Sequence, residues 1–173
     1  MREIPTIEEC EKWKINKMIN PITGYKITNK SGKVYKTFKK MCDEYDLDVD
    51  VIDLVPMMFD NLDVSAKTLK GVIVLNYKLL QDGDFFKDYS YMVHEVQHYF
   101  QQCFNKKPTV GGEGDDYLDN EYEKEAFQYQ IEYISKHFGE DEADNYTEHL
   151  LDHHEIKDED ERNNKKEELM AKV

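Results

Sequence analysis

The sequence predicts an α+β fold in which long amphipathic helices accompany a small β-sheet. Apolar residues recur at three- and four-residue steps over two long segments, around 84–104 and 118–138, and this is the period of a helix. Residues 71–77, GVIVLNY, form a short β-branched run bounded by Gly71 and the DGD turn at 82–84, a pattern typical of a strand. Stretches rich in Pro and Gly separate these elements.

The chain has 173 residues and a net charge of −14, and this charge is unevenly distributed. Residues 1–42 carry ten basic and four acidic residues, a net of +6, whereas residues 43–138 and 139–173 carry −12 and −8. We interpret this change of sign as a boundary between two modules, residues 1–45 and 46–173. The acidic balance argues against a nucleic-acid or anionic-membrane binder. No apolar run suits a membrane span or a signal peptide.

The first module is predicted to contain two helices with turns between them. Residues 6–19 form the first helix, with Thr6 as N-cap and Trp13 as its apolar anchor. Residues 20–38 suit turns and a small hairpin with SGK at its tip, and residues 36–46 are predicted to be helical again. The chain has three cysteines, too few for a disulfide scaffold, which favours a reducing, intracellular site of synthesis: Cys10, Cys42 and Cys103.

In the second module the clearest strand is at 71–77, and helices follow it. Pro108 and the glycine-rich stretch 111–114 end the first long helix. The second runs over roughly 118–138 and ends at Gly139, and a third follows at about 140–156. Residues 157–173 contain few apolar side chains, so we expect an acidic solvated helix or a frayed tail.

The first long helix contains the pentapeptide His94-Glu95-Val96-Gln97-His98. Residues four apart lie on the same face of a helix, so both imidazoles can reach one metal ion. Two nitrogen donors, a carboxylate and an open water position suit catalytic Zn²⁺. Glu95 is then the general base, because a carboxylate beside zinc can take a proton from water and pass it to the leaving amine. This pentapeptide also occurs by chance. Its position in a periodic helix that follows a strand favours a metal site over coincidence.

A third protein ligand must come from elsewhere in the chain. No histidine occurs between 99 and 136, so a carboxylate of the second long helix is the best source. Stepping 100° per residue places Glu123 near the centre of the apolar face, with Glu125 and Glu121 at or beyond its flank. Glu123 is favoured because a buried carboxylate needs a partner. Glu125 and then Glu121 remain alternatives, as does a solvated face that carries all three.

Other polar side chains have a more ordinary explanation. Three tyrosines can hydrogen-bond the oxyanion of a tetrahedral intermediate, although aromatic packing is the commoner role: Tyr117, Tyr122 and Tyr129. We assign the four remaining histidines to surface or cap positions: His137, His149, His153 and His154.

Residues 60–155 resemble a gluzincin-type metallopeptidase, in particular short phage and viral proteins with a strand, an HExxH helix and a later E-x-E-A-F-x-x-Q helix. Here these are Gly71–Tyr77, His94–Gln102 and Glu123–Gln130. The resemblance implies a zincin-like helical domain with a small β-sheet. It also implies zinc bound by His94, His98 and a glutamate, with Glu95 as general base.

The first module resembles the viral 2-cysteine adaptor domain of large DNA viruses. The matching residues are CEKW from Cys10, NPITG from Asn20, Lys26-Ile27, GKVY from Gly32, and Cys42. Such adaptors are fused to other viral enzymes, so the resemblance implies tethering to a viral or host protein and not chemistry. Cys10 and Cys42 either form a disulfide or remain reduced core residues.

These features together predict a zinc-dependent metallopeptidase encoded by a large DNA virus, with a protein or peptide substrate. The exposed edge of Gly71–Tyr77 would hold an extended peptide by strand addition. We expect the protein in the host cytoplasm or in the virion, without nucleic-acid or membrane partners. The main alternative is a non-catalytic virion or host-interaction protein that retains a zincin-like scaffold. A weaker one is a metallohydrolase acting on a non-peptide amide.

Overall fold

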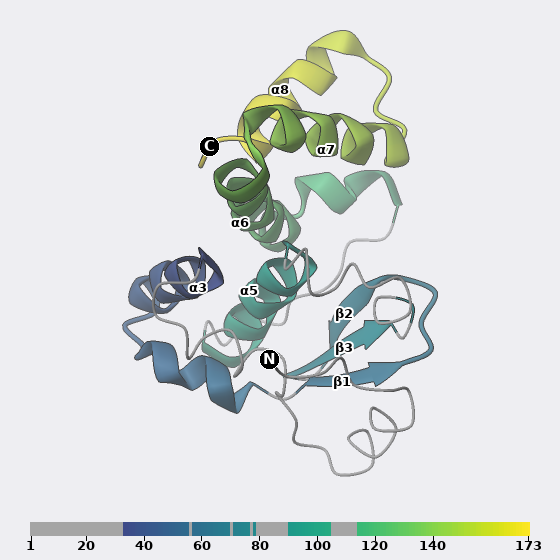
Figure 1. The fold of residues 1–173 in the computed structure, drawn as a ribbon. Helices are drawn as coiled ribbons and strands as arrows, with labels where there is room; N and C mark the ends of the chain where they lie inside the picture. The colour runs from purple at the N-terminus through teal and green to yellow at the C-terminus, as the bar shows by residue number, and fades with distance from the viewer. Residues whose placement is uncertain (1–32, 56, 70, 77, 79–89, 105–113) are drawn as a thin grey trace. The chain divides into compact units, whose positions relative to one another are not determined.

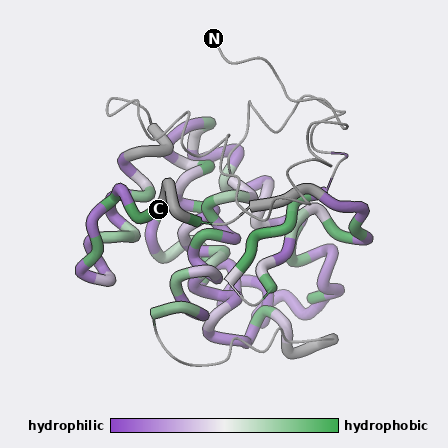
Figure 2. Tube along the Cα trace, turned by 90° about the horizontal axis from the view of Figure 1, so that it is seen from below, coloured by the Kyte–Doolittle hydropathy of each residue, from purple (hydrophilic) through white to green (hydrophobic). Residues whose placement is uncertain are grey.

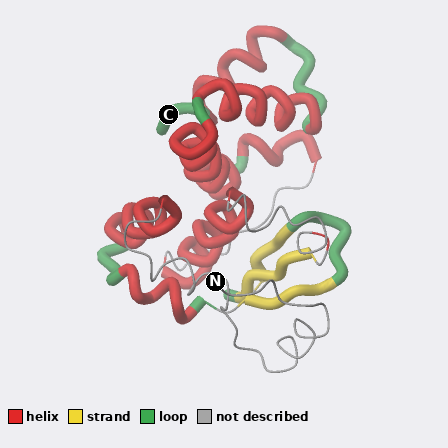
Figure 3. Tube along the Cα trace, viewed as in Figure 1, coloured by secondary structure: helices red, strands yellow, loops and turns green. Residues whose placement is uncertain are grey.

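The computed structural model describes residues 33–55, 57–69, 71–76, 78, 90–104 and 114–173. The chain is divided into two compact units, residues 1–106 and 107–173. The first unit contains α3 (Lys33–Glu44), η1 (Val49–Leu54), β1 (Met57–Asp60), β2 (Ala66–Leu69), β3 (Val72–Asn76) and α5 (Ser90–Phe104). The second contains η3 (Gly114–Asp119), α6 (Glu121–Phe138), α7 (Glu140–His153) and α8 (Glu159–Leu169). Helices and a small sheet confirm the α+β class (Figures 1 and 3).

The sheet of the first unit has the strand order β1-β3-β2 (Figure 1). β1 runs parallel to β3, with Met57 opposite Ile73, and β2 runs antiparallel to it, with Ala66 opposite Leu75. The predicted strand at 71–77 is confirmed as β3, whose Ile73, Val74 and Leu75 are buried. The prediction that this strand offers an exposed edge is wrong, because it is paired on both sides. The edge strands are β1 and β2.

Gly71 makes the turn between β2 and β3 possible. Its φ of 75° lies in the left-handed region that residues with a side chain rarely adopt. A Cβ at this position would also lie 3.4 Å from the Cys103 sulfur, on α5. The sheet therefore approaches α5 closely at this turn.

The helix α5 packs against β2, β3 and α3, and is buried over most of its length. Its apolar residues Met92, Val93, Val96 and Phe100 are fully buried, which agrees with the predicted periodicity. Buried polar side chains lie on the same helix: His94, Glu95, Gln97, His98 and Gln101. Buried polar groups need hydrogen-bond partners or a ligand, so α5 is the candidate location of a functional site.

The helix α3 replaces part of the predicted hairpin. Residues 33–38 are helical, so the second strand expected there is wrong. Apolar residues at 34, 38 and 41 follow the helical period and not the period of two, and Phe38, Met41 and Cys42 are fully buried. The expected helix at 6–19 and the rest of the hairpin lie outside the described residues.

Cys42 is a free, buried thiol in this structure. Burial raises the pKa of Cys42 from 9.0 to about 12, and the carboxylates of Asp43 and Asp48 add to the rise. The folded state thus keeps the thiol protonated. Its contribution to stability is complete below pH 9 and is lost as the pH rises from about 9 to about 12.

We therefore expect the free energy of unfolding of the parent to fall more steeply across this alkaline range than that of a Cys42→Ala protein. Denaturant titrations at several pH values measure this difference. A Cys103→Ala protein is the comparison: burial also raises the pKa of this exposed thiol, but by less than that of Cys42, so this substitution should change the alkaline slope less. Equal alkaline slopes for the parent and Cys42→Ala would contradict the prediction.

The second unit is a helical assembly with its own core. Asn120 caps α6, and its side chain accepts hydrogen bonds from the main-chain N–H groups of Tyr122 and Glu123. The core is formed by apolar residues of η3, α6, α7 and α8 together with Ile156: Leu118, Phe127, Ile131, Ile134, Ala143, Leu150, Leu151, Ile156 and Leu169. Figure 2 shows hydrophilic residues over much of the described chain, with shorter hydrophobic stretches between them.

Gly139 joins α6 directly to α7. It is the single residue between Phe138 and Glu140, and its φ of 105° requires glycine. The predicted end of the second long helix at Gly139 is thus confirmed. Phe138 was expected on the buried face, but it is 47% exposed because it occupies the last position of the helix.

The acidic C-terminal segment is helical and is held by ion pairs. Arg162 of α8 donates to Glu148 and Asp152, which both lie on α7, and Lys166 pairs with Asp144 and Glu148 of the same helix. Lys165, only 8% exposed, lies 2.5 Å from an Asp119 oxygen. The solvated-helix alternative for residues 157–173 is therefore correct over Glu159–Leu169. Among the described helices, none has both the length and the apolar character that a membrane span needs.

Candidate metal centre

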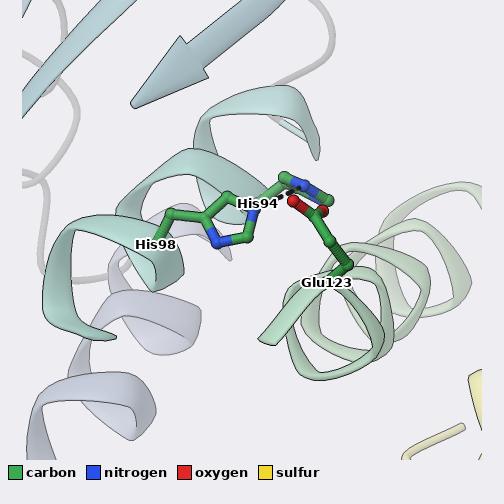
Figure 4. A group of neighbouring side chains, drawn as sticks. All are labelled: His94, His98 and Glu123. Carbon is green, nitrogen blue, oxygen red and sulfur yellow. Dashed lines mark hydrogen bonds between the residues drawn. The ribbon is translucent and has the colours of Figure 1, made fainter. Parts of the chain in front are cut away.

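His94 and His98 occupy successive turns of α5 and project from the same side of it (Figure 4). Their Nε2 atoms are 3.1 Å apart, and their ring centroids are 4.7 Å apart. Both side chains are buried. The helix thus directs two nitrogen donors to one point, as the four-residue spacing predicts.

Gln101 orients the second of these rings. His98 Nδ1 lies 2.8 Å from Gln101 Oε1, and this oxygen can only accept a hydrogen bond. In the neutral ring the proton therefore resides on Nδ1, and Nε2 presents its lone pair. Histidines that bind metals are commonly held in this way through the other ring nitrogen. Sequence reasoning missed Gln101, although its position three residues after His98 places it on the same side of the helix.

The two nitrogens fit zinc in distance as well as in tautomer. With Zn–N bonds of about 2.0–2.1 Å and tetrahedral angles, two ligand nitrogens lie about 3.3 Å apart. The observed separation is 3.1 Å. In a metal-free chain His94 Nε2–H can donate to His98 Nε2 across this distance, and a bound metal would take the place of that proton.

Glu95 belongs to the same helix but has different partners. One residue further along α5, it lies about 100° around the helix from His94. Its carboxylate Oε2 accepts a hydrogen bond from Thr68 Oγ1 of β2 at 2.5 Å. The side chain is only 6% exposed. Sequence reasoning did not identify Thr68, which is 27 residues away in a strand that was not predicted.

Glu123 lies in the first turn of α6, in the second unit (Figure 4). Of the three glutamates considered, Glu123 is buried, Glu125 is half-buried and Glu121 is exposed, which is the order that helical phase predicts. Tyr117 Oη donates to Glu123 Oε2 at 2.9 Å. This bond orients the carboxylate. Which glutamate is the ligand stays a prediction.

The other tyrosines and histidines considered from the sequence lie in cap, packing or surface positions. Tyr129 is buried, with the Lys172 ammonium 4.7 Å from its ring centroid, and Tyr122 is half-buried. His154 is the C-cap residue of α7, and its ring stacks on Tyr117 with the planes 12° apart. Burial, and then the neighbouring His153, lowers the pKa of His154. His149 and His153 are exposed.

Comparison with known families assigns one segment of the chain. A model of the 2-cysteine adaptor domain matches residues 9–44, which confirms the adaptor resemblance for that segment. Comparisons with curated proteins and with solved structures gave no match. The matched segment includes α3, which belongs to the first compact unit together with α5. The boundary at residues 45 and 46 stays a prediction.

The packing of α3 leads to an expectation about truncation. Phe38, Met41 and Cys42 are fully buried in contact with the first unit, and each buried apolar side chain contributes roughly 1.5–3 kcal/mol. We expect deletion of residues 1–45 to lower the melting temperature and to weaken zinc binding at α5. Deletion of residues 1–32, which keeps α3, is the matched control. Thermal melts followed by circular dichroism compare the two. Equal melting temperatures would show that α3 does not stabilise the rest of the first unit.

Proposed function

We propose that this protein is a zinc-dependent metallopeptidase with an N-terminal adaptor segment, and that His94, His98 and Glu123 bind the zinc. The observation that carries the proposal is the pair of Nε2 atoms on α5, one of which is set as a lone-pair donor by Gln101. A helix rarely buries two imidazoles and a carboxylate in five residues without a use for them, because their desolvation is costly. Glu123 supplies the negative charge that balances a divalent cation.

Bound zinc would supply a Lewis acid that polarises the peptide carbonyl and makes water more acidic. Glu95 has the role of general base. Its carboxylate accepts a proton from the attacking water and later delivers it to the leaving nitrogen as the C–N bond breaks. Tyr117 donates to Glu123 and so orients the carboxylate that would help to hold the metal. Gln101 keeps the proton of His98 away from the metal side.

An extended peptide substrate would add to the edge strand β2, and not to β3. Asn76 N–H donates to Ser65 C=O, and ladder bonds in antiparallel pairs alternate, so residues 66 and 68 direct their main-chain groups away from β3. The Thr68 carbonyl accepts a hydrogen bond from Gln102 Nε2. Ala66 therefore offers the main-chain groups best placed to pair with a substrate.

Metal analysis of the purified full-length chain tests the proposal. We expect one zinc per chain in the parent and little or none in His94→Ala and His98→Ala. His149→Ala is the control, since this exposed histidine is not a proposed ligand. Circular dichroism establishes that each variant is folded. A folded parent that binds no zinc, or alanine variants that retain it, would refute the proposed site.

The adaptor match favours a second candidate function. Residues 9–44 match a domain named for an adaptor role, and such a role requires no catalysis. The protein would then be a non-catalytic virion or host-interaction protein that keeps a zincin-like scaffold. This candidate predicts zinc binding without peptide cleavage, whereas the peptidase predicts both. Binding to a viral or host protein, and a place in the host cytoplasm or the virion, belong to both proposals.

A further inference from the structure

The side chain of Thr68 links the sheet to the helix that carries Glu95. Thr68 is half-buried on β2, and its Oγ1 lies 2.5 Å from Glu95 Oε2. The same hydroxyl lies 3.1 Å from the main-chain carbonyl oxygen of Glu95. A hydrogen bond to an ionised carboxylate is stronger than one between neutral groups. The Thr68 hydroxyl therefore favours the position in which it donates to Glu95 Oε2.

Gln102 fixes the main chain of the same strand. Its Nε2 donates to the Thr68 carbonyl at 3.1 Å, and its Oε1 accepts from the Gly71 N–H at 3.1 Å. Gln102 lies seven residues after Glu95, or about 10.5 Å along the helix axis. The end of β2 is thus attached to α5 at two positions two turns apart. The Thr68 hydroxyl has little freedom to leave Glu95.

We propose that Thr68 is the positioning residue of the general base. This inference rests on the proposed peptidase function. Thr68 holds Oε2 of Glu95, so that Oε1 is the atom that takes the proton from water and returns it to the leaving nitrogen. The Thr68 proton remains on Thr68 throughout, and the only proton that moves is the one from water.

The arrangement also joins substrate binding to catalysis. The proposed substrate edge at Ala66 is two residues from Thr68 on the same strand. A peptide paired with β2 would therefore be connected through this strand to the carboxylate that acts on it. Placement of a base within a fraction of an ångström contributes to rate because misplacement by about 1 Å can cost 10²-fold.

Thr68→Val tests this role, since valine keeps the shape and removes the hydroxyl. We expect kcat on a peptide that the parent cleaves to fall about 10–100-fold, the usual cost of a lost outer hydrogen bond, with KM within about twofold. Thr68→Ser should return kcat to within a few-fold of the parent. Thr68→Ala carries the same expectation as Thr68→Val if valine impairs folding. Thr147→Val is the matched control, because that hydroxyl donates to Ala143 C=O in α7.

Two measurements without turnover accompany the kinetics. Zinc content should be unchanged in Thr68→Val. Calorimetry should detect weaker binding of a peptide hydroxamate, whose hydroxyl would meet the same carboxylate in the proposed site. An active parent with Thr68→Val equal to it in kcat and hydroxamate affinity would overturn the positioning role alone. Loss of zinc in Thr68→Val and Thr68→Ser alike would assign Thr68 to the fold and overturn the role as well. A parent without zinc or cleavage overturns the proposed function, and with it this inference.

Discussion

A Glu95→Gln protein is expected to retain its zinc and to cleave peptides about 10²–10⁴-fold more slowly than the parent. Glutamine has nearly the same shape and can still accept the hydrogen bond from Thr68 through its carbonyl oxygen. It cannot take a proton from water. Initial rates on a peptide cleaved by the parent, together with the zinc content of both proteins, measure the two expectations.

Glu132→Gln is a suitable control for this experiment. Glu132 is also a buried glutamate, but it lies on α6 and pairs with Lys136. Its loss should alter stability and leave the zinc content unchanged. If Glu95→Gln emptied the metal site, Glu95 would be a ligand and its assignment as a base would be wrong. Unchanged cleavage by a zinc-loaded Glu95→Gln protein would show that Glu95 is not the general base.

Replacing Glu123 with alanine should weaken zinc binding by more than the roughly 10–100-fold that loss of an outer hydrogen bond costs. Only two protein ligands would remain, whereas zinc sites use at least three. Glu121→Ala should have almost no effect, because Glu121 is exposed. Glu125→Ala should weaken zinc binding by at most roughly 10–100-fold, through loss of a hydrogen bond to one of the ligand side chains. Competition with a chelating dye in one buffer compares all three variants.

The Glu123 experiment has one decisive negative outcome. Glu123→Ala would bind zinc like the parent, while Glu125→Ala or Glu121→Ala would not. The ligand would then lie on another face of α6, and the argument from helical phase would fail. Circular dichroism must accompany the comparison, because Glu123 is buried near the N-terminus of α6.

Long periodic segments could be predicted from the sequence alone. The helices α5 and α6 extend over 15 and 18 residues, so each contains several turns of apolar repetition. The same periodicity correctly placed Glu123 on the buried side and Glu121 on the exposed side of α6. The spacing of His94 and His98 is likewise a local property of one helix. The adaptor match required only the order of residues in a short segment.

Short strands and contacts between distant residues could not be predicted. β1 and β2 have four residues each, too few to display the alternation that identifies a strand. Without β2, the sequence offers no reason to connect Thr68 with Glu95. The same gap explains why β3 was assigned to an edge. Gln101 is a different case, because its spacing from His98 can be read from the sequence. Whether it forms a hydrogen bond with His98 depends on the orientation of the imidazole ring, which the sequence does not give.

The joint at Gly139 has a consequence for how this chain can change in length. Because only Gly139 separates α6 from α7, the connection cannot accommodate an insertion or a deletion without moving one of the helices. Adding one residue to either helix near the joint rotates everything beyond it by about 100°. Leu150 and Leu151 would then turn away from the core that they form with Phe127. Length can vary beyond Leu169 without such a rotation, but at the joint a single codon gained or lost would separate two helices that now share one core.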